Sequence, residues 1–318
     1  MHVSVVIPCY NAERFLRETL GSIVAQTRPV TEIIVVNDGS KDDSARIAAE
    51  FDPRVRVINQ VNQGESAARN RGIAEATGDW IALLDADDLW EPAKLERQLE
   101  AAATGGESVV CVYTDFYFFR DGKKSATVQF PANHESPDYV AHMLSKATVN
   151  TSSALLRAKV VKQVKFPEET RDAEDLIFFT SLRELGTFVR IPEPLVGYRV
   201  SGGNQSSRRD HALRSVRSCL AWFDRRADRY PAETRAAVYR QFCAKLLDAH
   251  EMAYWSRDHR TVLACRELYR QLHDGKDALP EALSRRLLPE WLVRFKDSLD
   301  ARLFGRTRHA ERAGELPE

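Results

Sequence analysis

Three carboxylates stand close together in the stretch Asp85-Ala86-Asp87-Asp88. They follow residues 80–84, a short apolar run that predicts a buried strand of an α/β sheet. Ligands of open α/β sheets bind beyond the carboxyl ends of the strands, and carboxylate oxygens suit Mg²⁺ or Mn²⁺. The stretch therefore predicts a metal or ligand site at a strand end. The alternative is that these acids cap the helix that follows.

Polar side chains also follow each of the three predicted strands that come earlier in the chain. They are Tyr10 and Asn11 after the first strand, Asp38 after the second, and Asn62, Glu65 and Arg69 after the third. An aspartate such as Asp38 accepts a hydrogen bond from the N–H of a uracil-like base or from a ribose hydroxyl; the alternative is an ordinary Asp-Gly turn. Arg69 is suited to a diphosphate, and equally to an exposed ion pair on a helix.

Strands and helices alternate through the first hundred residues. The predicted strands are residues 3–7, 32–37, 55–59 and 80–84, and the predicted helices after them are residues 15–24, 42–51, 64–76 and 92–103. Pro8 is predicted to end the first strand. This alternation is typical of a parallel sheet with helices on both faces, which makes residues 1–104 a Rossmann-like, nucleotide-binding half-domain.

The pattern changes after Gly105 and Gly106. The predicted elements are strands at residues 108–113, 153–156, 187–190 and 195–200, a hairpin of residues 116–120 and 126–130, and a helix at residues 175–185. We expect a mixed, partly antiparallel sheet in residues 105–207, which would complete an α/β domain at residues 1–207. From Asp210 onward the pattern is helical, so residues 208–318 are predicted to form an all-helical C-terminal region.

Composition and missing motifs exclude several classes of protein. The chain carries 46 Lys and Arg against 46 Asp and Glu, which argues against a nucleic-acid-binding protein. The segment from Arg208 to the end has 23 basic and 17 acidic residues, which favours either an anionic partner or a solvated helical face. Five scattered cysteines and no long apolar segment predict a soluble cytosolic protein with reduced thiols. No dinucleotide or P-loop signature is present.

Four segments, taken in order, closely resemble the inverting glycosyltransferases of family 2. They are residues 3–11 (VSVVIPCYN), 34–42 (IVVNDGSKD), 64–72 (GESAARNRG) and 83–88 (LLDADD). The resemblance covers about the first two hundred residues and implies the GT-A fold, a nucleotide-sugar donor and a divalent metal. It implies that Asp38 holds the base, that Asp85 faces the ribose and sugar, and that Asp87 holds the metal on the diphosphate. The donor contacts implied in full are Pro8, Tyr10, Asn11, Asp38, Gly64, Arg69, Asp85 and Ala86.

An acidic pair in the second half extends the resemblance. Glu174-Asp175 resembles the family's acidic pair at the start of a helix, which implies that Asp175 is the general base and that Glu174 touches donor or acceptor. Capping of that helix is the alternative. Ser152 lies in a segment that resembles the acceptor side of the family's site. Arg199 belongs to a segment similar to Tyr-Arg-x-His, with Ser201 in place of the histidine, so Arg199 or water would have to substitute for it.

The sequence as a whole predicts an inverting, metal-dependent glycosyltransferase. It would move a sugar from a nucleotide donor, expected to be UDP-linked, to a hydroxyl of a glycan or glycolipid in polysaccharide or cell-envelope biosynthesis. Mg²⁺ or Mn²⁺ is the expected cofactor. The alternatives are a nucleotidyltransferase on a related fold and an inactive carbohydrate-binding relative. The C-terminal region would complete the core, form a homodimer, or place residues 290–308 against the inner face of the cell membrane.

Overall fold

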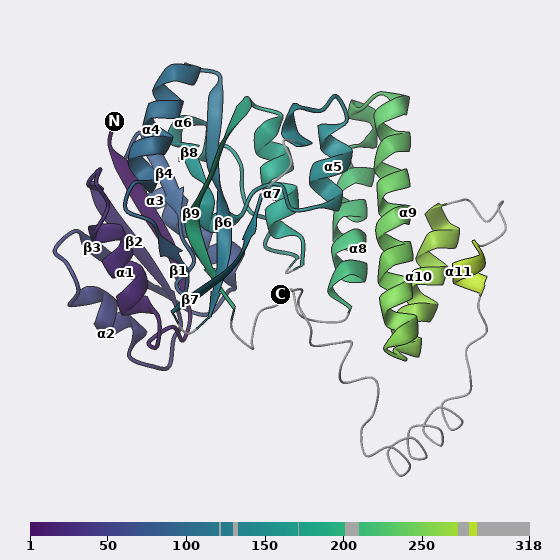
Figure 1. The fold of residues 1–318 in the computed structure, drawn as a ribbon, viewed down its shortest axis with the longest axis horizontal. Helices are drawn as coiled ribbons and strands as arrows, with labels where there is room; N and C mark the ends of the chain where they lie inside the picture. Colours follow the sequence, from purple (N-terminus) through teal and green to yellow (C-terminus); the bar gives the residue numbers. More distant parts are fainter. Residues whose placement is uncertain (121, 130–132, 171, 201–209, 273–279, 285–318) are drawn as a thin grey trace, which may run out of the picture.

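The structure is a computed structural model of the 318-residue chain. It describes residues 1–120, 122–129, 133–170, 172–200, 210–272 and 280–284, and the remaining residues lie outside the description. Figure 1 shows one twisted sheet with helices packed around it, and a separate group of helices beside it at the C-terminal side. Ser201 and residues 290–308, to which the sequence assigned roles, fall outside the described residues.

The first half of the sheet is parallel, as the alternation predicts. Its strands are β1 (Val3–Cys9), β2 (Glu32–Asp38), β3 (Val55–Gln60) and β4 (Trp80–Leu83), in the order β3-β2-β1-β4. The helices of this half are α1 (Leu16–Val24), α2 (Ser44–Ala49), α3 (Glu65–Glu75) and α4 (Lys94–Gly105). Every residue of β1 is buried, which requires cover on both faces of the sheet.

The prediction that Pro8 ends the first strand is wrong. β1 continues to Cys9, and Pro8 lies opposite Val36 of β2. The pairing of β1 with β4 stops at Val6, so the side of β1 that faces β4 has no ladder for a proline to interrupt.

The second half of the sheet is mixed, as predicted. Its strands are β5 (Leu89–Trp90), β6 (Val109–Arg120), β7 (Lys123–Val128), β8 (Leu155–Arg157) and β9 (Thr187–Arg199), and the order continues as β4-β8-β6-β9-β5 with β7 beside β6. The predictions of two separate strands along β6, and again along β9, are wrong. Pro194 lies at a register shift of the β6–β9 pair, where a residue without an amide N–H breaks no regular ladder bond.

Two apolar cores hold the molecule together. The first lies on the sheet, and the second joins α5 (Tyr139–Ser145) and α7 (Glu174–Arg183) to the C-terminal helices. The other helices are α6 (Ala158–Val161), α8 (His211–Asp224), α9 (Ala232–Trp255), α10 (His259–Leu272) and α11 (Glu281–Ser284). In Figure 1, α5 and α7 lie between the sheet and α8–α9. The helical region therefore shares its core with elements from before the predicted boundary at residue 207.

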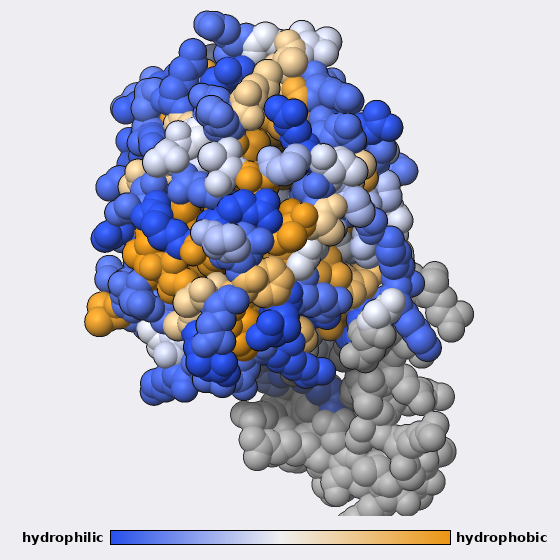
Figure 2. Space-filling model, turned by 90° about the vertical axis from the view of Figure 1, so that its left-hand side faces the viewer, coloured by the Kyte–Doolittle hydropathy of each residue, from blue (hydrophilic) through white to orange (hydrophobic). Residues whose placement is uncertain are grey.

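Hydrophilic side chains predominate on the face of the molecule that Figure 2 shows, around a smaller group of hydrophobic ones. Among the described residues, none of the helices combines the length and the apolar character that crossing a membrane requires.

Candidate active site

A large cavity lies at the carboxyl ends of β1 and β4, where the order of the strands reverses. The chain moves from β1 outward to β2 and β3, and then returns to place β4 on the other side of β1. Such a reversal leaves a crevice between the loops that leave the two strands. The cavity has a volume of about 1080 Å³. The loops after β1 and β4 line it together with the start of α3 and of α7.

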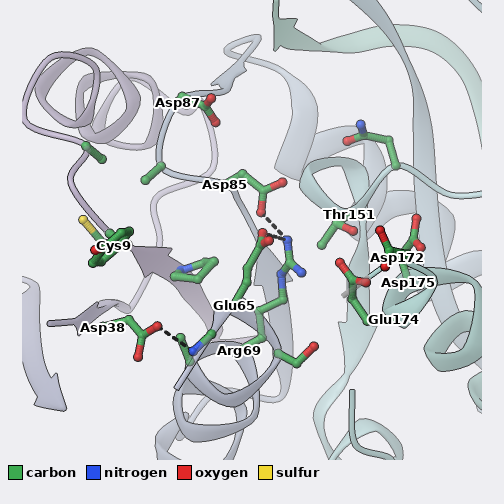
Figure 3. A pocket seen from close by; sticks show the side chains of 18 of the residues that line it. Cys9, Asp38, Glu65, Arg69, Asp85, Asp87, Thr151, Asp172, Glu174 and Asp175 are labelled. Atoms are coloured by element: carbon green, nitrogen blue, oxygen red, sulfur yellow. Dashed lines mark hydrogen bonds and ion pairs between the residues drawn. The ribbon is translucent and has the colours of Figure 1, made fainter. Parts of the chain in front are cut away.

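Most of the residues predicted from the sequence line this cavity. They are Pro8, Tyr10, Asn11, Asp38, Gly64, Arg69, Asp85, Ala86, Asp87, Glu174 and Asp175. Figure 3 shows Asp38 on one side, Arg69 with Asp85 in the middle, and Glu174 with Asp175 on the far side. The fold thus gathers side chains that are up to 167 residues apart in the sequence, from Pro8 to Asp175.

Asp38 is buried and fixes the loop that leads into α3. Its Oδ1 accepts hydrogen bonds from Gln60 Nε2 at 2.8 Å and from the amide of Gln63 at 2.9 Å, and its Oδ2 accepts one from the amide of Gly64 at 2.8 Å. Gly64 has φ +94°, a conformation that only glycine adopts without strain. Since each carboxylate oxygen has two acceptor positions, Oδ2 retains one for a ligand.

Arg69 is the centre of an ion-pair network in the middle of the cavity. Its Nη2 donates to Asp85 Oδ1 at 2.7 Å and also to Glu65, while its guanidinium lies over the ring of Phe166. Burial works against the charge of Arg69, but Glu65 and Asp85 more than compensate and raise the pKa of the guanidinium. Burial, with Asp85, Glu174 and Asp87 nearby, raises the pKa of Glu65 to about 7.

Asp87 and Asp88 are neighbours with different environments. The carboxylate of Asp87 lines the cavity, and burial together with Asp85 raises its pKa to about 6. Asp88 does not line the cavity: it is 1% exposed and accepts hydrogen bonds from Ser152 Oγ at 2.6 Å and from the amide of Arg199 at 2.9 Å. Burial raises the pKa of Asp88 well above its ordinary value.

The helix-cap alternative for these acids is wrong. The N-cap of α4 is Ala93, and β5 separates it from residues 85–88. The prediction that Asp88 faces a ligand is also wrong, because its carboxylate accepts hydrogen bonds from Ser152 and Arg199 and does not line the cavity.

Ser152 and Arg199 support the loop of residues 85–88 from behind and do not line the cavity. Ser152 Oγ accepts from the amide of Asp85 at 3.1 Å in addition to its bond to Asp88. Arg199 Nε donates to the carbonyl of Asp87 at 2.6 Å, and its Nη2 pairs with Glu18 at 2.6 Å. The sequence predicted that Ser152 contacts an acceptor and that Arg199 contacts phosphate or metal. In the structure neither side chain reaches the cavity, and both hold the loop of residues 85–88 in place.

Glu174 and Asp175 begin α7 and face the cavity. Asp175 Oδ1 accepts a hydrogen bond from the amide of Leu176 at 2.8 Å. Burial raises the pKa of Asp175, and burial together with Asp175 raises that of Glu174. Two neighbouring carboxylates with raised pKa values in a cavity are typical of groups that exchange protons.

Several polar lining residues received no role from the sequence, among them Glu65, Asn150, Asp172 and His211. Glu65 lies within the segment 64–72 with Arg69, and Asp172 lies two residues before Glu174, so these positions in the sequence were the available signal. Asn150 and His211 carry no such signal. His211 reaches the cavity because α8 packs beside α7, a contact that local sequence does not encode.

The cavity is strongly acidic, which would favour the binding of a metal cation. Among the described lining residues, Arg69 is the only Arg or Lys, against eight carboxylates: Asp38, Glu65, Asp85, Asp87, Glu168, Asp172, Glu174 and Asp175. No cluster of three His, Cys, Asp or Glu suited to a metal ion occurs in the described part of the chain. Mg²⁺, however, is commonly held by one or two carboxylates together with substrate phosphates. Asp87 fits that pattern, because a cation beside it would offset both its burial and its repulsion from Asp85.

Comparisons with known proteins agree with this architecture. Residues 4–164 match the family described as Glycosyl transferase family 2. An uncharacterized glycosyltransferase of Nostoc sp. is 34% identical over 216 residues, which span 64% of this chain and 66% of that relative. S. aureus TarS (residues 1–349) in complex with UDP-GlcNAc has a TM-score of 0.56 at 18% identity, covering 86% of this chain and 91% of that chain.

A second solved structure has the same fold. The mannosyltransferase PcManGT of Pyrobaculum calidifontis, in complex with GDP-Man and Mn²⁺, has a TM-score of 0.55 at 20% identity and covers 94% of this chain and 80% of that chain. Both likenesses show the GT-A fold that the motifs implied. The family match covers residues 4–164, about half of the chain, and both solved structures agree with it. The chain belongs to family 2 of the glycosyltransferases.

Proposed function

We propose that this chain transfers a sugar from a nucleotide-sugar donor to a hydroxyl of a glycan or glycolipid, with inversion at the anomeric carbon. The observation that carries the proposal is one cavity with two chemically different sides. Asp38, Arg69, Asp85 and Asp87 stand on the donor side, and Asp175 stands across from them. This division matches a reaction in which the leaving group departs on one side and a base acts on the other.

The donor side suits a nucleoside diphosphate. Asp38 has a free acceptor position for the N–H of a uracil-like base, and Tyr10, which is 50% exposed at the rim, offers a ring for stacking. The UDP-GlcNAc bound to TarS and the GDP-Man bound to PcManGT belong to this class of donor. We expect UDP-linked sugars to be preferred.

A divalent cation completes the donor side in this proposal. Eight lining carboxylates against one guanidinium would repel a diphosphate unless a cation came with it. Asp87 would hold Mg²⁺ or Mn²⁺, with Asp85 beside it. When bound, such an ion stabilises negative charge on the departing phosphate oxygens as a Lewis acid. PcManGT carries Mn²⁺ together with its donor.

Asp175 is the general base in this proposal. Inversion requires that the acceptor hydroxyl attack the face of the sugar opposite the diphosphate, and that it lose its proton to a group on that side. Asp175 lies across the cavity from the donor residues and does not belong to the candidate metal site. Its raised pKa makes it a stronger base than an ordinary aspartate.

The test is a donor screen with purified protein. We expect hydrolysis or transfer of a UDP-sugar with Mg²⁺ or Mn²⁺ and its loss with a chelator, and the release of nucleoside diphosphate measures it. Asp87→Asn should lose the metal dependence of donor binding. Asp79→Asn is the matched control, because Asp79 precedes β4 and is well exposed, far from the cavity end of the strand. Absence of turnover with every nucleotide sugar would refute the proposal, and release of pyrophosphate would favour a nucleotidyltransferase.

A further inference from the structure

The acceptor side of the cavity contains buried oxygen atoms that have no hydrogen-bond donor. We call the residues Asn150, Asp172, Glu174 and His211 the acceptor subsite; all four line the cavity. Within the described part of the chain, Asn150 Oδ1 and Glu174 Oε2 are buried and make no hydrogen bond. These oxygens are not on the cavity surface, whereas the side chains that carry them line the cavity. A buried acceptor without a donor costs free energy, so a rotation of either side chain that brings its oxygen to an O–H group of a ligand is favoured.

The third acid of the subsite is tied to the C-terminal helical region. Asp172 Oδ1 lies 2.9 Å from Arg214 Nη2 and 3.5 Å from His211 Nδ1, both on α8. These distances allow ion pairing, but the angles do not meet those of hydrogen bonds. Asp172 Oδ1, His211 Nδ1 and Arg214 Nη2 therefore make ion pairs without hydrogen bonds. Arg214 does not line the cavity, and Asp172 and Asp210 compensate its charge.

The chemistry of the subsite thus separates neutral from anionic ligands. A hydroxyl-rich sugar brings several donors to Asn150 and Glu174 and adds no charge. A carboxylate or phosphate brings only acceptors, and it adds negative charge beside Glu174, Asp175 and Glu168, with no uncompensated Lys or Arg among the described lining residues of this side. Like charges brought together at a site are strongly disfavoured.

We propose that the acceptor subsite selects an uncharged, hydroxyl-rich sugar at the acceptor end and rejects one that carries a carboxylate or phosphate beside the attacking hydroxyl. Asp172 is a positioning residue in this proposal, because it neutralises Arg214 and so keeps that cation from attracting an anionic acceptor. The inference rests on the proposed transfer reaction and names the class of acceptor for it.

The test uses matched acceptors and the full-length chain with the donor that it turns over. The pairs are p-nitrophenyl glycosides of glucose, galactose and mannose, each compared with its uronic acid, which differs only at C6. We expect transfer to a neutral member, or inhibition of donor hydrolysis by it, and at least a roughly 10-fold weaker effect of its uronic acid. Equal or better use of a uronic acid would overturn the inference, as would no effect of any neutral glycoside on either readout.

Charge variants separate selection from simple loss of folding. Asp172→Asn removes one of the two carboxylates that compensate Arg214, leaving only Asp210, and should raise the relative use of uronic acids. The double variant Asp172→Asn/Arg214→Gln removes both charges and should restore the preference for neutral acceptors. A merely structural role for Asp172 would lower both activities in proportion and leave their ratio unchanged, which would contradict the proposal.

Two asparagines provide a control for the polar contact. Asn150→Leu should raise the KM for the acceptor, whereas Asn62→Leu, on the donor side, should raise the KM for the donor. An unchanged acceptor KM in Asn150→Leu would count against the subsite. If donor hydrolysis itself is absent in the wild type, the proposed function fails; if hydrolysis is present and the selectivity is not, only this inference fails.

Discussion

Arg69 shows how much of the site depends on the shape of one side chain. Its side chain is 4% exposed, and its guanidinium pairs with Glu65 and Asp85 and lies 5.2 Å from the centre of the Phe166 ring. A planar guanidinium can serve both carboxylates and the ring at once, whereas an ammonium is a single point charge. Arg69 therefore holds Asp85 in place and also leaves positive charge where a diphosphate would lie.

At this scale we predict that Arg69→Lys weakens donor binding by roughly 10-fold or more, although it keeps the charge. The measurement is donor affinity by isothermal titration calorimetry. Arg71→Lys is the matched control: Arg71 is two residues away on α3, exposed, and paired only across the helix surface with Glu75. Equal effects of the two substitutions would show that the geometry of Arg69 is unimportant.

Asp88 marks the limit of prediction from the sequence at the residue scale. The acidic strand end and its place in the sheet could be predicted, because the apolar run before it and the acids after it are local. The separation of Asp87 from Asp88 could not, because it depends on Ser152 and Arg199, which lie 64 and 111 residues beyond Asp88.

The element that orients the loop of residues 85–88 is β9. Arg199 near its end donates to the carbonyl of Asp87, and its guanidinium lies over the rings of Phe15 and Phe119. Arg190, earlier on the same strand, makes a two-bond pair with the buried Asp115 at 2.9 and 2.6 Å. One arginine of β9 thus supports the site and the other supports the sheet.

We predict that the two arginines of β9 respond differently to the same substitution. Arg199→Lys should weaken metal-dependent donor binding roughly 10-fold, because a lysine cannot donate to Asp87 and pair with Glu18 in the same geometry. Arg190→Lys should lower the free energy of unfolding by about 1–2 kcal/mol and leave donor binding within about 2-fold, since distant sites act independently. Calorimetry and chemical denaturation give the two readouts. Lost donor binding in Arg190→Lys alone would reverse the assignment.

The elements themselves could be predicted where the local pattern is strong. The parallel β1–β4 half follows from alternating apolar strands and amphipathic helices. The long strand β9 could not be predicted as a single element, because Pro192 and Pro194 normally end a strand and only pairing with a neighbour can accommodate them. The continuity of β6 depends on its pairing with β9, which continues through register shifts at Thr114 and Asp115.

At the scale of the whole molecule, one apolar core joins the start of α7, which carries Glu174 and Asp175, to the C-terminal helices. Leu176 and Ile177, next to Asp175, pack in the same cluster as Val216, Phe223 and other residues of α8 and α9. The sequence predicts these helices but not their partner, because burial of an amphipathic face does not say what covers it.

Stability of the ligand-free molecule should depend on pH in an unusual direction. The folded state raises the pKa of Glu65 to about 7 and that of Asp87 to about 6, whereas unfolded glutamate and aspartate titrate near about 4. Between these values the folded state binds more protons at these two carboxylates than the unfolded state does, so their contribution to the free energy of unfolding falls as the pH rises through about 6 to 7.

Urea denaturation of the ligand-free protein at several pH values between about 5 and 8 checks this prediction. Glu65→Gln should flatten the dependence, and Mg²⁺ with UDP should restore stability at the higher pH because it binds only the folded state. A free energy of unfolding that falls no more steeply with pH in the wild type than in Glu65→Gln would contradict the repulsion among the cavity carboxylates.

The central claim is that donor binding and base catalysis are carried out by opposite sides of one cavity. The most direct test compares the wild type with Asp175→Asn for donor affinity and for sugar transfer to an accepted glycoside. We predict donor affinity within about 2-fold of the wild type and a loss of transfer of about 10²–10⁴-fold, the usual contribution of a general base. Transfer retained within about 10-fold, or donor affinity lost together with transfer, would contradict the account.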